Sequence, residues 1–64
     1  MKIAKTLNSK VAEDVYNLGW DYVIEHVNGD IAVFCFLIED GFFESVASLG
    51  LTSGDFILSD TLSF

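Results

Sequence analysis

The amino-acid sequence predicts a small α+β domain whose elements follow the order β-α-β-β-α-β. Two observations lead to this prediction. Residues 20–38 have the pattern of a β-hairpin, and we expect an antiparallel sheet centred on it. On either side of that segment, apolar residues recur at the spacing of an amphipathic helix, which predicts two short helices. Residues 1–64 are enough for a single acidic α+β domain and no more.

The predicted hairpin rests on three consecutive features. Residues 20–27 are rich in β-branched and aromatic side chains. Asn28-Gly29 follows after them and is the preferred pair for a two-residue type I′ turn. Residues 31–38 then form an unbroken apolar run, which is typical of a buried strand.

A two-residue turn would also fix the register of the two strands, with Val27 opposite Asp30. One face of the hairpin is then nearly all apolar and is expected in the core. The other face is mixed, so either another element covers its phenylalanines or they help to form a binding surface. The apolar face holds Trp20, Tyr22, Ile24, His26, Ile31, Val33, Cys35 and Leu37, and the mixed face holds Asp21, Val23, Glu25, Val27, Asp30, Ala32, Phe34 and Phe36.

The two predicted helices have recognisable ends. Asn8 or Ser9 caps the first helix, and Gly19 ends it. Asp40 is the expected N-cap of the second helix, which ends at Gly50. The apolar stripes are Val11, Val15 and Leu18 in the first helix and Phe42, Val46 and Leu49 in the second.

The outermost strands are predicted at the two ends of the chain. Residues 1–7 form the first, with alternate side chains on opposite sides. Residues 56–58 form the last, and Leu62 and Phe64 are expected to extend it.

The composition points to an intracellular protein that holds itself together by apolar packing. Hydrophobic residues make up 52% of the chain, and a disordered chain would have fewer. Cys35 is the only cysteine, which excludes an internal disulfide and fits a reducing compartment. The first ten residues lack the apolar region of a signal peptide, and residues 31–38 are too few to span a bilayer. We therefore expect a cytoplasmic protein.

Charge is the most unusual feature of the sequence. The net charge is −7, from ten acidic residues and three lysines, and there is no arginine. All three lysines, Lys2, Lys5 and Lys10, lie in the first ten positions. Such a field repels nucleic acid and anionic membranes and favours a basic protein surface as partner. The alternative is that the acids only keep an apolar-rich chain soluble.

No pattern in the sequence predicts a catalytic site, a metal site or a cofactor. His26 and Cys35 share a face in the predicted register, but they stand about 13 Å apart, too far for an imidazole to activate a thiol. The carboxylate pair Asp21 and Glu25 has little room for a cleft beside it, and the glycines have no phosphate-loop spacing. We therefore expect a protein that is not an enzyme.

The remaining prediction is a protein-binding function. In general character the chain is similar to the small acidic proteins with which phages block host enzymes or defence systems, in its size, charge and lack of catalytic motifs. This similarity implies an inhibitor or regulator that mimics nucleic acid and occupies a basic surface of a nucleic-acid-handling protein. The alternative is a homodimer formed through residues 56–64. The candidate partner-binding residues are Asp21, Glu25, Asp30, Phe34, Phe36, Glu39, Asp40 and Glu44.

Overall fold

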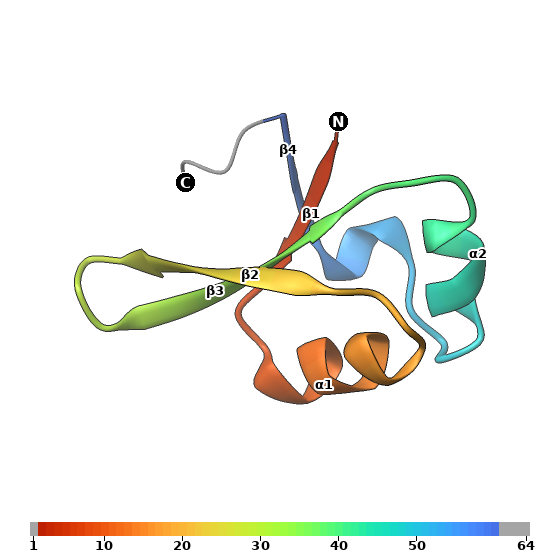
Figure 1. Ribbon diagram of the computed structural model, residues 1–64, viewed down its shortest axis with the longest axis horizontal. Helices are drawn as coiled ribbons and strands as arrows, with labels where there is room; N and C mark the ends of the chain where they lie inside the picture. Colours follow the sequence, from red (N-terminus) through yellow and green to blue (C-terminus); the bar gives the residue numbers. More distant parts are fainter. Residues whose placement is uncertain (1, 61–64) are drawn as a thin grey trace.

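The structure is a computed structural model that describes residues 2–60 (Figure 1). A four-stranded antiparallel sheet and two helices confirm the small α+β class. The strand order in the sheet is β2-β3-β1-β4, so the predicted hairpin forms one side of the sheet and not its centre. The predicted extension of the last strand by Leu62 and Phe64 lies outside the described residues. Along the chain the elements are β1 (Ile3–Thr6), α1 (Ser9–Asn17), β2 (Tyr22–Val27), β3 (Ile31–Leu37), α2 (Phe42–Ala47), a turn of 3-10 helix η1 (Ser53–Asp55) and β4 (Ile57–Ser59).

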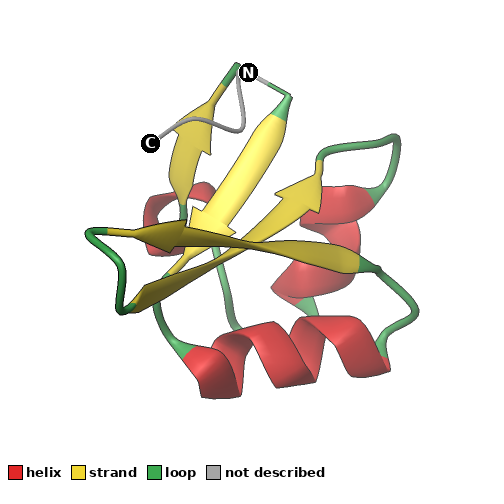
Figure 2. Cartoon of the chain, turned by 60° about the vertical axis from the view of Figure 1, so that its left-hand side comes forward, coloured by secondary structure: helices red, strands yellow, loops and turns green. Residues whose placement is uncertain are grey.

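Both helices lie on the same side of the sheet (Figure 2). The core between the two layers is built around Phe42 of α2, whose ring centroid lies 5.3 Å from that of Trp20 and 5.8 Å from that of Phe56. Edge-on ring contacts of this kind add to the stability that burial provides. The buried members of this core are Ala4, Ala12, Val15, Phe36, Phe42, Val46 and Phe56.

The predicted register of the hairpin is wrong by one residue. Val27 pairs with Ile31, not with Asp30, and the remaining pairs follow from there. Asn28 and Gly29 do adopt the positive φ angles, 54° and 81°, that a type I′ turn requires. Asp30 then stands as an additional loop residue between the turn and β3. Side chains alternate between the two faces along a strand. The one additional residue therefore moves each side chain of β3 to the opposite face relative to the side chains of β2.

The ends of the helices are only partly as predicted. The side chain of Asn8 caps α1 and accepts hydrogen bonds from the backbone N–H groups of Lys10 and Val11. The expected cap of α2 at Asp40 is wrong. The cap residue is Gly41, whose positive φ of 86° suits glycine. No side chain accepts a capping hydrogen bond at this position.

Candidate protein-binding surface

One face of the sheet lies opposite the helices, and we call it the open face. Residues that are partners across neighbouring strands share a face, so the pairing defines its members. Ile3 of β1 lies opposite Leu37 of β3, and Val23 of β2 lies opposite Cys35. The open face consists of Ile3, Lys5, Val23, Glu25, Val27, Ile31, Val33, Cys35, Leu37, Ile57 and Ser59.

The open face combines a buried centre with exposed apolar side chains around it. Val33 and Cys35 are buried and form a small second core with Ile3. Toward the outside of the face, Leu37 is 57% exposed and Val23 is 54% exposed. Exposed apolar groups gathered on one face of a small protein mark a surface that can associate with a partner.

A partly buried ion pair crosses the open face. The Lys5 side chain is 1% exposed, and its Nζ lies 3.4 Å from Oε1 of Glu25, whose side chain is 22% exposed. Lys5 belongs to β1 and Glu25 to β2, so the pair extends over the intervening strand β3. Glu25 is therefore a structural partner of Lys5, which reduces its availability to a second protein.

The cysteine of the open face is a buried thiol. Burial raises the pKa of Cys35, and the nearby positive charge of Lys5 partly offsets this rise. His26 pairs with Ala32 while Cys35 pairs with Val23, so the histidine and the cysteine lie on opposite faces. The prediction that they share a face is wrong, and the observed pairing keeps the imidazole away from the thiol. Within residues 2–60 no group of three His, Cys, Asp or Glu side chains could hold a metal ion.

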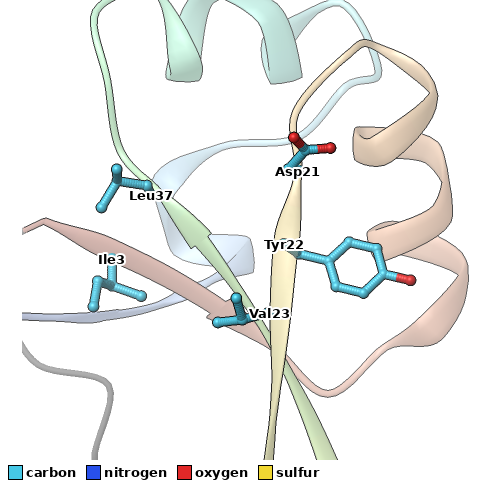
Figure 3. A pocket seen from close by; sticks show the side chains of 5 residues that line it. All are labelled: Ile3, Asp21, Tyr22, Val23 and Leu37. Atoms are coloured by element: carbon cyan, nitrogen blue, oxygen red, sulfur yellow. The ribbon is translucent and has the colours of Figure 1, made fainter.

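A groove of about 290 Å³ opens on this face where β2 begins and β3 ends. Figure 3 shows the side chains of Ile3, Leu37 and Val23 on one side of β2, each from a different strand, while the Tyr22 ring points the other way, toward α1. The carboxylate of Asp21 stands at the end of the groove. The groove is thus an apolar hollow with a single carboxylate beside it.

The predicted aromatic anchors do not contribute to this surface. Phe36 is fully buried in the core beneath the helices, and Phe34 is half-buried, with its ring 5.2 Å from that of Tyr22. The predicted register, which is wrong, had placed both phenylalanines on the same hairpin face as Asp21 and Glu25. Val23 and Leu37 occupy the open face instead. The sequence pattern could have placed these two residues on one face only if the loop had been assigned its correct length of three residues.

The predicted acidic residues are spread over several parts of the chain. Asp21 lines the groove, and Asp30 lies in the hairpin loop. Glu39 and Asp40 lie in the segment between the end of β3 and α2, and Glu44 lies in the first turn of α2. All five are exposed. The ion pairs within residues 2–60 join Lys5 to Glu25 and Lys10 to Asp14, and neither includes these five acids.

Comparison with known protein families, with curated proteins and with solved structures finds no match for this chain. No helix among the described residues has both the length and the apolar character needed to cross a membrane.

Proposed function

We propose that this chain is a small acidic protein-binding module that inhibits or regulates a nucleic-acid-handling protein by occupying its basic surface. The observation behind the proposal is an exposed apolar surface beside carboxylates that no lysine of the described chain neutralises. Val23 and Leu37 supply the apolar part, and Asp21, Glu39 and Asp40 supply charge at the same end of the hairpin. Interfaces commonly combine a few apolar anchors with charges that steer association.

A nucleic-acid-handling protein is a suitable partner because of its own chemistry. Lys and Arg side chains that bind phosphate also bind carboxylate with similar geometry. A net charge of −7 on a chain of 64 residues attracts such a surface and repels nucleic acid itself. The proposed mode of action is therefore competition with nucleic acid for the same basic groups.

The test is capture of partners from a bacterial lysate on the immobilised protein, at about 0.05 M and about 0.5 M salt, because ionic screening lengths fall several-fold over this range. We expect a nucleic-acid-handling protein that is captured at low salt, lost at high salt and released by added DNA or RNA. Capture that is unaffected by salt and by nucleic acid would contradict the proposal.

Self-association through the last strand is the second candidate. β4 stands last in the strand order of the sheet, and Ile57 is 43% exposed. Phe56, the first residue of the predicted pairing segment, is buried in the core and is not available for a dimer. A mass in solution that rises from monomer to dimer with concentration would favour this candidate, and a constant monomer mass would exclude it.

A further inference from the structure

We propose that the partner contributes an extended, cationic segment that adds as a further strand beside β2 and places a long apolar side chain over Val23 into the groove. This inference rests on the proposed function and specifies how the partner is recognised. It combines three features that meet at one end of the hairpin: a sheet edge, an apolar groove and unneutralised carboxylates.

The sheet edge is the outer side of β2. In the described residues β2 pairs with β3 alone and stands first in the strand order. An edge strand presents alternate backbone N–H and C=O groups outward, and an incoming extended segment can bind them by strand addition. Tyr22–Val27 has six residues and no proline or glycine, so several consecutive positions are available for pairing.

The groove lies beside this edge on the open face. Val23 separates the outer edge of β2 from Leu37 and Ile3. A side chain on an added strand lies about 5 Å from its neighbour on β2, so a leucine-sized group there packs on Val23 and reaches the groove. Filling the groove removes exposed apolar surface from water, which favours binding.

Charge selects the kind of segment that binds. Asp21 lies at the end of the groove, and Glu39 and Asp40 follow the neighbouring strand. A lysine-bearing or arginine-bearing segment is attracted to this end of the hairpin. A second copy of this chain brings a further charge of −7 to the same place and is disfavoured.

The test uses a fluorescein-labelled peptide in which lysine and leucine alternate, with binding followed by fluorescence anisotropy. Two further peptides carry backbone N-methyl groups, one on every lysine and the other on every leucine. An added strand donates hydrogen bonds from alternate residues only. We therefore expect one methylated peptide to bind about as well as the parent and the other to bind at least roughly tenfold more weakly, since it loses several backbone hydrogen bonds.

Two neutral substitutions of β2 test the groove. Val23→Asn changes the open face, whereas Ile24→Asn changes a residue of similar exposure, 47%, on the opposite face of the same strand. We expect Val23→Asn to weaken binding of the parent peptide roughly tenfold and Ile24→Asn to change it less than about twofold. Thermal unfolding of both variants verifies that each is folded.

The outcomes separate this inference from the proposed function. Equal binding of both methylated peptides, or equal effects of the two substitutions, overturns the inference. If either result is obtained but binding of the parent peptide still weakens as the salt concentration rises, the proposed acidic protein-binding function stands. No binding of the parent peptide at low salt also overturns the inference, and the proposed function is then decided by the capture from lysate.

Discussion

Lys5 reaches across β3 to Glu25, with its Nζ 3.4 Å from the carboxylate oxygen, and its side chain is almost fully buried. The pair ties the inner strand β1 to the edge strand β2 on the face of the sheet that the helices do not cover. A buried ammonium group needs such compensation because its removal from water is costly. One of the three lysines of this acidic chain is thus part of its interior.

Substitutions at this ion pair are expected to differ in cost. Glu25→Gln keeps the shape but removes the charge that compensates Lys5, and we expect it to lower the free energy of unfolding by about 1 to 3 kcal/mol. Lys5→Met removes the buried charge itself and is expected to cost less than Glu25→Gln. Urea unfolding of both variants measures the difference. A larger loss from Lys5→Met would contradict this role of the pair.

Cys35 is expected to be an unreactive thiol in the folded protein. Because burial raises its pKa above the ordinary 9.0, little thiolate is present at pH 8. We expect Ellman's reagent to react at least roughly tenfold more slowly with the native protein than with the protein in urea. A native rate equal to the unfolded rate would show that the thiol is accessible and would contradict its place in the buried centre of the open face.

The raised pKa of Cys35 also has a consequence for stability. The folded state holds the thiol proton more tightly than the unfolded state, so this contribution is complete below pH 9.0 and is lost as the pH rises through the folded pKa. We expect the wild type to lose more stability than Cys35→Ala between neutral pH and the alkaline range. Identical pH profiles for the two proteins would contradict the burial of the thiol.

Deletion of Asp30 is expected to preserve the hairpin. Asn28 and Gly29 already have the positive φ angles of a two-residue turn, and Val27 already pairs with Ile31. Without Asp30 the loop becomes the preferred two-residue connection, so the free energy of unfolding should change by less than about 1 kcal/mol. NMR contacts between Val27 and Ile31 should remain. Their loss, or pairing shifted by one residue, would contradict the observed register.

The cap of α1 provides a prediction with a matched control. Asn8→Ala removes the acceptor for two backbone N–H groups and should lower the free energy of unfolding by about 1 kcal/mol. Asn17→Ala, at the other end of the same helix, removes no capping bond and should have little effect. Equal losses from the two substitutions, measured by urea unfolding, would show that the cap contributes nothing specific.

The local features of this fold could be predicted from the sequence because they depend on neighbouring residues. Asn8 acts on the two amides that follow it closely, and Asn28-Gly29 has intrinsic access to the turn conformation. The N-cap of α2 shows the limit of such signals. Asp40 has the better capping side chain, but the backbone turns one residue later, at Gly41.

The candidate binding surface could not be predicted because it depends on pairing between distant segments. The groove exists only because Ile3 lies beside Leu37, and Lys5 is buried only because β1 joins β3. A single loop residue, Asp30, decides that Val23 and not Tyr22 lies on the same face as Leu37. Periodicity identifies which residues alternate along one strand, but it does not give the offset between strands.

The central claim is that the carboxylates at the groove end of the hairpin bind a basic protein partner. The most direct measurement compares the affinity of the partner captured from lysate for Asp21→Lys and for Glu13→Lys, an equal charge change at an exposed position of α1. We expect Asp21→Lys to weaken binding by roughly tenfold or more, and Glu13→Lys to have a much smaller effect. Equal losses from both variants would mean that only net charge matters, and this would contradict a binding surface at the groove.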